Sequence, residues 1–181
     1  MENVNIPNFL KKEEVSLFHK GLNFQSYKIL GSKFIKSGVF KGVTYFAVWA
    51  PNAKSVSVIG DFNNWNEDSQ IMEKNLDSGI WVLFVKNLKM GSRYKYYIVS
   101  EDNKVMIKTD PFSTYYSSAP DNSSIIYDIS NYKWNDDKWM SRRSKINYEI
   151  TPISIYELHL GSWTSKKDIN NSFLNYRKIS E

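Results

Sequence analysis

The chain has 181 residues, with 24 Lys or Arg against 19 Asp or Glu, which leaves a formal net charge of +5. It contains no cysteine, which excludes disulfides and zinc–thiolate sites and agrees with a reducing cytosol. No stretch approaches the about 20 apolar residues of a membrane span, and the first residues lack the pattern of a signal peptide. We therefore expect a soluble, cytoplasmic protein with no membrane partner.

The excess of positive charge does not indicate a nucleic-acid partner. Lysines are spread evenly along the chain, whereas nucleic-acid-binding surfaces gather basic residues on one element. The chain is instead rich in flat side chains, with 6 Trp and 12 Tyr. Such side chains fill a large core, or they form a surface that holds flat ligands such as sugars.

Residues 1–30 are predicted to form a short helical or irregular lead-in, because no hydrophobic period continues for long. The lead-in carries four apolar residues that could dock on a neighbouring surface, namely Leu17, Phe18, Leu22 and Phe24.

Residues 31–130 are predicted to form an all-β domain, an antiparallel sandwich of immunoglobulin-like size. Short alternating or apolar runs are separated by turn residues at a spacing of roughly ten, and no helical period appears. We expect Trp49 and Trp81 to lie in the core, because both belong to strands. The predicted strands are Val43–Trp49, Ser55–Ile59, Ile80–Val85, Tyr94–Val99, Val105–Ile107 and Ser124–Ile129.

Residues 131–150 have the polar composition of a linker, but they include Trp134 and Trp139. Large rings are costly to leave in water, so we expect both to pack against a neighbouring surface. Asn135 or Asp136 is a plausible start of a short capped helical turn.

Residues 151–181 are predicted to begin a second fold. Ile153–Leu160 is apolar on both faces, which is typical of a strand in a parallel sheet or barrel. Asn171–Glu181 has the pattern of a helix start, with Ser172 as a possible cap. A strand, a loop and a helix form the first βα unit of a larger, here incomplete, (β/α)₈ barrel.

Several segments in the same order resemble one family. Phe46–Trp65 resembles the N-terminal carbohydrate-binding module of 1,4-α-glucan (glycogen) branching enzymes and their relatives in the α-amylase family. The most specific match is Ser154–Trp163 (SIYELHLGSW), which is similar to the first barrel strand of those enzymes. Further similar segments are Leu17–Gly31, Lys108–Phe112, Tyr132–Met140 and Phe173–Arg177.

The resemblance implies what the parent enzyme does. It would cleave an α-1,4 bond in a glucan and transfer the chain to a 6-hydroxyl, using a nucleophilic carboxylate and an acid/base carboxyl group. The family's carboxylates follow later barrel strands, so no catalytic residue is assigned here and the chain alone is expected to be inactive. The implied partners are α-glucan and the catalytic barrel, and no cofactor is implied.

Trp65 is the sharpest binding candidate, because its large ring stands in a loop with Asn63 and Asn64. A sugar ring stacks on an indole while amides bind its hydroxyl groups. In related modules a Trp here contacts sugar and a Lys assists, which corresponds to Lys95. A second stacking Trp of those modules is replaced here by Asn103-Lys104-Val105. The alternative is that Trp65 packs on the catalytic domain and binds nothing.

Four other polar side chains are candidates for a functional role. Glu157 and His159 share one face of the predicted last strand, and we expect them to line the barrel interior rather than to bind metal, since a zinc site needs three or four ligands. Asp61 and Asp110 are interpreted as turn formers. Three alternatives to a branching enzyme stay open: a free-standing glycan-binding or regulatory module, the N-terminal part of a debranching enzyme, and a generic immunoglobulin-like interaction domain.

Overall fold

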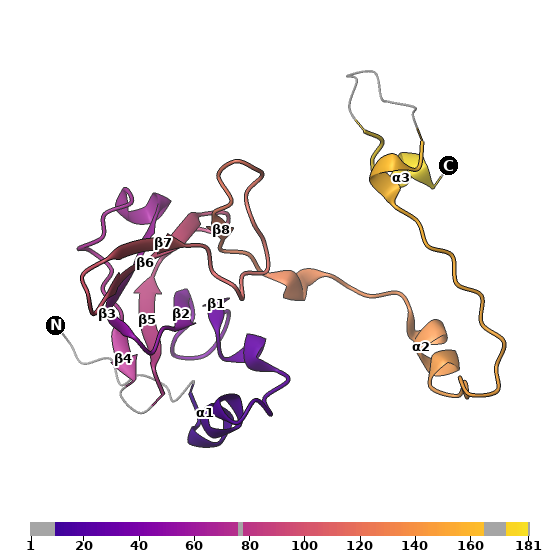
Figure 1. The fold of residues 1–181 in the computed structure, drawn as a ribbon, viewed down its shortest axis with the longest axis horizontal. Coiled ribbons are helices and arrows are strands. Elements are labelled where there is room, and N and C mark those ends of the chain that lie inside the picture. The colour runs from indigo at the N-terminus through magenta and orange to yellow at the C-terminus, as the bar shows by residue number, and fades with distance from the viewer. Residues whose placement is uncertain (1–9, 76–77, 165–172, 181) are drawn as a thin grey trace. The chain divides into compact units, whose positions relative to one another are not determined.

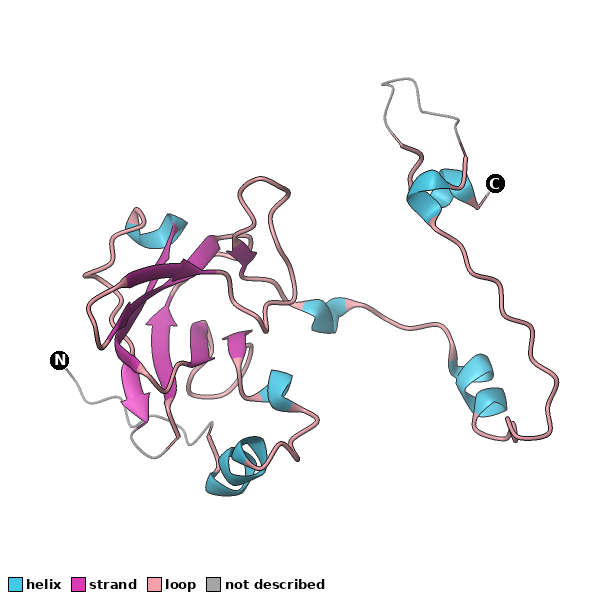
Figure 2. Ribbon diagram, viewed as in Figure 1, coloured by secondary structure: helices cyan, strands magenta, loops and turns pink. Residues whose placement is uncertain are grey.

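The computed structural model describes residues 10–75, 78–164 and 173–180. Contacts divide the chain into two units, Met1–Tyr132 and Lys133–Glu181. All strands found among these described residues belong to the first unit (Figures 1 and 2), which is an antiparallel sandwich as predicted from the sequence. In the described residues no helix is both long and apolar enough to cross a membrane.

The first sheet has the strand order β1-β2-β5-β4, and each pair of adjacent strands in it is antiparallel. Its strands are β1 (Gly31–Phe34), β2 (Val43–Trp49), β4 (Glu73–Asn75) and β5 (Ile80–Lys86). The second sheet has the order β3-β6-β7, and β8 also pairs with β6. Its strands are β3 (Ala53–Gly60), β6 (Arg93–Ser100), β7 (Val105–Lys108) and β8 (Ser124–Ile125).

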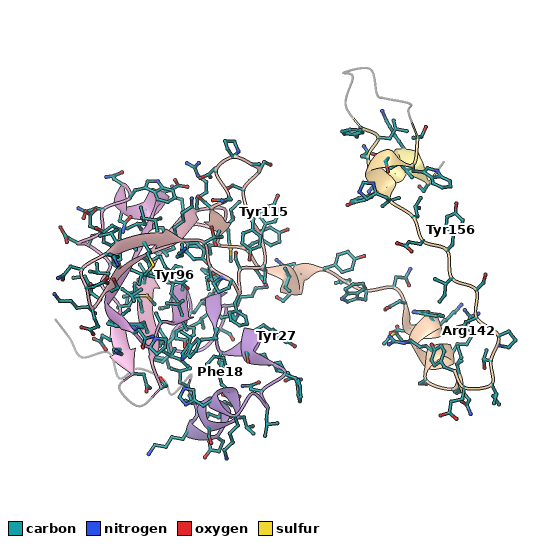
Figure 3. All side chains as sticks on the ribbon, viewed as in Figure 1. Phe18, Tyr27, Tyr96, Tyr115, Arg142 and Tyr156 are labelled. Atoms are coloured by element: carbon teal, nitrogen blue, oxygen red, sulfur yellow. The ribbon has the colours of Figure 1, made fainter. Side chains whose placement is uncertain are left out.

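The main core lies between the two sheets, because alternate residues of each strand point to the same side. Strand β2 contributes Phe46 and Val48, and β6 contributes Tyr94 and Tyr96. The rings of Phe46 and Tyr94 meet edge-on at 5.1 Å. Figure 3 shows Tyr96 in this part of the molecule. The other buried members of the cluster are Ala53, Val56, Val58, Met72, Trp81 and Ile126.

The opposite face of the first sheet is also covered. Helix α1 (Lys12–His19) and the residues beside it place Leu10, Ile29 and Leu30 against Tyr45 and Ala47 of β2. A 3₁₀ turn at Ser26–Lys28 leads back to β1. The lead-in therefore belongs to the first unit's core. Of its four predicted docking residues, Phe18 packs on this cluster, whereas Leu17, Leu22 and Phe24 are exposed.

Three details of the predicted strands are corrected. Strands β1 and β4 were not predicted, and the last predicted strand, Ser124–Ile129, is paired only over Ser124–Ile125. Beyond it, Asp128 ends the extended run by accepting a hydrogen bond from the Ser130 backbone in a 3₁₀ turn at Ile129–Asn131. Trp81 is buried as expected, but Trp49 is 51% exposed, because it is the last residue of its strand.

The second unit holds helix α2 (Asp137–Arg143), with Asp136 at the N-cap position as predicted, although its side chain forms no capping bond. Trp139 is 47% exposed and lies 5.4 Å from the Arg142 guanidinium, while Trp134 is 75% exposed. The packing of both rings against a neighbouring surface stays a prediction.

The first βα unit of a barrel is not confirmed. Residues 153–159 belong to no strand, and a 3₁₀ turn at Leu160–Ser162 follows them. A parallel strand requires a neighbour to pair its N–H and C=O groups, and no described segment lies in register with this one. Helix α3 (Tyr176–Ile179) is present, and its cap is Asn175, which accepts from the Lys178 N–H. The predicted cap, Ser172, lies outside the described residues.

Candidate functional site

Trp65 stands in a tight loop directly after β3. A 3₁₀ turn over Asp61–Asn63 begins at Gly60, and Asn64 and Trp65 follow with φ values of 52° and 59°. Gly60 is required for close approach here, because a Cβ atom built on it would lie 2.3 Å from the Arg93 carbonyl oxygen. The loop therefore lies tightly against the start of β6.

Asn63 holds the loop together through its side-chain amide. Its Oδ1 accepts from the Gly60 N–H at 2.9 Å, and its Nδ2 donates to Val58 O, Asn66 O and Ser69 Oγ. Both N–H donors of Asn63 are thus used within the loop, whereas its oxygen, which has two lone pairs, accepts one hydrogen bond there. The predicted sugar contact of Asn63 stays a prediction. Asn64, in contrast, is exposed at the left-handed end of the turn.

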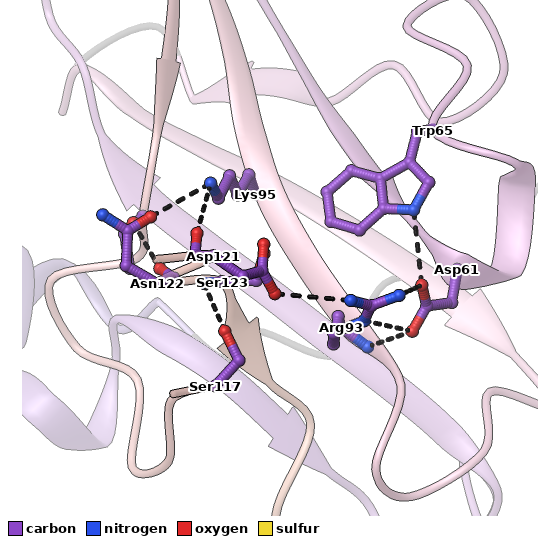
Figure 4. A network of polar contacts seen from close by, with 9 residues as sticks. Asp61, Trp65, Arg93, Lys95, Ser117, Asp121, Asn122 and Ser123 are labelled. Carbon is purple, nitrogen blue, oxygen red and sulfur yellow. Dashed lines mark hydrogen bonds and ion pairs between the residues drawn. The ribbon is translucent and has the colours of Figure 1, made fainter. Parts of the chain in front are cut away.

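The Trp65 ring is half-buried and is positioned by two charged residues. Its Nε1–H donates to Asp61 Oδ1 at 3.3 Å, and the Arg93 guanidinium lies 5.9 Å from the ring centre (Figure 4). Arg93 also donates to both Asp61 oxygens, from Nη2 at 3.0 Å and from Nε at 3.2 Å. This paired contact fixes the plane of the guanidinium beside the indole.

Asp61 is ionised in this arrangement. Partial burial acts to raise its pKa, but the hydrogen bonds and charge of Arg93, together with the indole N–H, lower the pKa of Asp61 below its ordinary value. Asp61 was interpreted from the sequence as a turn former. It does open the 3₁₀ turn, and it also anchors Trp65 and Arg93.

Lys95 lies two residues beyond Arg93 on β6, so both side chains leave the same face of the strand. Its ammonium donates to Asp121 O at 2.9 Å and to Asn122 Oδ1 at 3.1 Å. An ammonium has three N–H donors, so one remains for a ligand. Asn122 is exposed, and its Nδ2 donates to no group within the described part of the chain.

Asp121 connects the two halves of the site. It accepts from Arg93 Nη1 at 3.4 Å and from Ser123 Oγ at 2.7 Å. Hydrogen bonds from Ser123 and Ser117 and the charges of Arg93 and Lys95 lower the pKa of Asp121. Figure 4 shows the resulting network, in which Arg93 lies between Asp61 and Asp121, with Trp65 at one end and Lys95 and Asn122 at the other.

Sequence reasoning named Trp65 and Lys95, which lie in one network, but it missed Arg93, Asp121 and Asn122. Arg93 could have been found from its spacing of two from Lys95 on a predicted strand. Asp121 and Asn122 carry no such signal, because the fold brings them to β6 from a loop far along the chain.

Glu157 and His159 lie in the second unit, both are exposed, and His159 Nδ1 is 2.7 Å from Ser162 Oγ.

The first unit is thus an antiparallel sandwich that carries an aromatic ring, amides and cations in one polar network. Residues 29–113 match the family model of carbohydrate-binding module 48, the isoamylase N-terminal domain.

Relatives match over almost the whole chain. The chain is 42% identical to the 1,4-alpha-glucan branching enzyme GlgB of Oceanobacillus iheyensis over 94% of its own length and 26% of the relative's. It is 38% identical to GlgB of Francisella tularensis subsp. novicida, over 98% of this chain and 27% of that protein. The resemblance to branching enzymes is thus confirmed, and the chain spans about a quarter of the length of the curated relatives it matches. A solved pullulanase from Klebsiella pneumoniae overlaps 55% of this chain and 11% of its own at 21% identity and a TM-score of 0.44.

Proposed function

We propose that the chain is the N-terminal part of a 1,4-α-glucan branching enzyme and that its sandwich holds α-glucan on the surface around Trp65. One observation carries the binding proposal: the Trp65 ring, the Lys95 ammonium and the Asn122 amide belong to one network of polar contacts on the first unit. The ring offers an apolar face to a glucose unit, and the ammonium and amide offer N–H donors to its hydroxyl groups.

The proposed role of this surface is to hold the glucan that the whole enzyme branches. The whole enzyme would cleave an α-1,4 bond and transfer the freed chain to a 6-hydroxyl through a covalent glycosyl-enzyme intermediate. The catalytic carboxylates are assigned to the barrel, so these 181 residues alone are expected to transfer no chain. A cytoplasmic location and an intramolecular contact with the catalytic barrel are further parts of the proposal.

The first experiment is glycogen co-sedimentation of the 181-residue chain, of Trp65→Ala and of Trp139→Ala. Trp139 is a matched control, because it is also partly exposed beside an arginine but lies in the other unit. We expect the unchanged chain and Trp139→Ala to sediment with glycogen and Trp65→Ala to stay in the supernatant. Absence of all three from the pellet would refute glucan binding and favour the alternative that Trp65 supports the catalytic domain.

Catalysis is tested separately. The purified chain is incubated with amylose, and new α-1,6 branches are counted by isoamylase digestion or by the anomeric proton signals. We expect none. Branch formation by this chain would contradict the assignment of the carboxylates to the barrel.

A further inference from the structure

A pocket of the first unit lies at Trp49. The pocket has a volume of about 550 Å³, and Trp49 itself is 51% exposed. Residues of α1, of the end of β2 and of the turn before β5 line it: Phe18, His19, Trp49, Pro51, Ser78 and Gly79.

Direct contacts between these three segments hold the walls in place. Phe18 meets Trp49 edge-on, with ring centres 5.7 Å apart and planes at 78°. His19 Nε2 lies 2.8 Å from Ser78 O, and Ala50 N–H donates to Gly79 O at 3.0 Å. Gly79 has a φ of +66°, and a Cβ atom on it would lie 2.8 Å from the Pro51 Cβ. The pocket is therefore formed before any ligand arrives.

The described lining residues have the chemistry of a site for an amphipathic ligand. Among the described residues no Asp, Glu, Lys or Arg lines the pocket, although 24% of the chain is charged. The Ser78 carbonyl can only accept a hydrogen bond, so His19 Nε2 must donate, and Nδ1 of the neutral ring is left as an acceptor. An indole face beside an acceptor suits a pyranose ring, which has an apolar C–H face and hydroxyl groups at its rim.

We propose that the Trp49 pocket binds a glucose unit of an α-glucan, as a second site distinct from the surface at Trp65. The identity of the ligand rests on the proposed function, whereas the pocket itself does not. The ring of the sugar stacks on Trp49, and one hydroxyl donates to His19 Nδ1.

The two sites are separated by the length of β3. The Trp49–Pro51 turn precedes β3 and the Trp65 loop follows it, and eight residues at about 3.3 Å each span roughly 26 Å. One or two glucose units cannot reach both sites. A long glucan can occupy both, and the second contact then forms at the high effective concentration set by the first.

The test observes the indole N–H signals of the six tryptophans by ¹⁵N–¹H NMR during titration with maltotriose, up to about 10 mM, where a site with a Kd of about 1 mM is nearly saturated. Phe substitutions at Trp49, Trp65 and Trp139 assign the signals. We expect the Trp49 and Trp65 signals to shift and the Trp139 signal to stay. The Trp49 shift should persist in Trp65→Ala, and cellotriose, with β-1,4 bonds, should produce neither shift.

The outcomes separate the two proposals. A Trp49 signal that does not move while that of Trp65 does overturns the second site and leaves the first intact. The reverse result supports the second site and refutes the first, and no shift at all refutes both. Equal shifts of Trp49 with cellotriose overturn the assignment to α-glucan. These shifts are measured on the unaltered chain, and the Phe variants serve only to assign its signals.

His19→Ala provides a second test of the pocket. We expect the dissociation constant measured from the Trp49 signal to rise about 2- to 10-fold, as for the loss of one hydrogen bond, with the Trp65 signal unaffected. His159→Ala is the control, because His159 is the other histidine and lies in the second unit. An unchanged constant in His19→Ala would contradict the proposed hydroxyl contact.

Discussion

The hydroxyl group of Tyr94 donates a 2.6 Å hydrogen bond to Oδ2 of Asp110 inside the sandwich. The Tyr96 hydroxyl donates to the same oxygen at 3.1 Å, and the Phe112 N–H donates to Oδ1 at 2.8 Å. Asp110 was predicted as a turn former, and the Phe112 contact agrees with this. Its carboxyl group also connects the turn after β7 to two core tyrosines of β6.

Asp110 makes the stability of the first unit depend on pH. Burial, opposed by these hydrogen bonds, raises the pKa of Asp110 above its ordinary value. A raised folded-state pKa means that its contribution to stability is complete below the unfolded value of about 3.9 and is lost as pH rises through the raised pKa. Asp110→Asn cannot ionise, and it should cost about 1–3 kcal/mol at acidic pH through poorer hydrogen bonds.

The measurement is urea unfolding of both proteins between pH 3.5 and 7, followed by tryptophan fluorescence. The other carboxyl groups are the same in both proteins, so their effects largely cancel in the difference between the two free energies of unfolding. We expect the stability advantage of the original chain over Asp110→Asn to narrow with rising pH. An advantage that widens would contradict the raised pKa.

Arg93 is predicted to act on glucan affinity through Trp65. Arg93→Ala removes the guanidinium beside the ring and the paired contact with Asp61, so the indole loses its support. We expect glycogen affinity to fall about 2- to 5-fold, the range of an exposed cation–π contact. Arg142→Ala, which removes the matching contact of Trp139, should leave the affinity unchanged in the same titration. Equal effects of both variants would argue against a specific role of Arg93.

Gly60 is predicted to matter for both stability and binding. In Gly60→Ala the added Cβ meets the Arg93 carbonyl and the Phe62 ring, and relieving this overlap should cost about 1–3 kcal/mol. The same shift displaces Arg93, so glycogen affinity should also fall.

Gly91→Ala is the matched control. Gly91 has a φ of +89° and nothing within 4 Å of a built Cβ, so its cost of about 1–2 kcal/mol is purely conformational. Urea unfolding should show a loss in both variants, and co-sedimentation should show weaker binding only in Gly60→Ala. Full binding by a folded Gly60→Ala would show that the approach of β3 to β6 does not position the site.

Hydrogen exchange should distinguish residues 153–159 from the sandwich. None of their backbone N–H groups donates a hydrogen bond within the described structure, whereas β5 is paired on both sides. We expect peptides covering 153–159 to exchange fully at the first time points of an exchange experiment read by mass spectrometry, and peptides covering Ile80–Lys86 to be protected. Comparable protection of both would indicate a pairing that the described structure lacks.

The sequence predicted the central strands because their side chains alternate between two buried environments. Phe46 packs in the core between the sheets and Tyr45 packs under α1, so both faces of β2 carry large apolar or aromatic side chains. Such a continuous run of β-forming residues is recognisable as a strand in the sequence. Strands β1 and β4 carry no such pattern, since GSKF and EKN are mostly polar. They are defined by backbone pairing at the edges of the sheet, which local composition does not encode.

The candidate sites show the same division. Trp65 and Lys95 could be named from local pattern and resemblance, whereas Asp121 and Asn122 reach Lys95 only through the fold. Trp49 was predicted to be buried because it belongs to a strand whose other residues are mostly apolar and buried. It shares a face with Tyr45 and Ala47, but α1 ends at His19 and covers that face incompletely there. The exposure of Trp49 therefore depends on where α1 ends, and the sequence pattern of the strand itself contains no information about that.

The packing of α1 on the first sheet bears on how this module can be expressed by itself. The family match spans residues 29–113, yet Leu10, Val15 and Phe18 cover Tyr45, Ala47 and Ile80, and Ile126 completes the opposite core. A polypeptide trimmed to the matched boundaries would expose one apolar sheet face and open a gap in the other. Exposed faces of that kind promote self-association. The smallest autonomously folding segment should therefore run from about Leu10 to beyond Ile126.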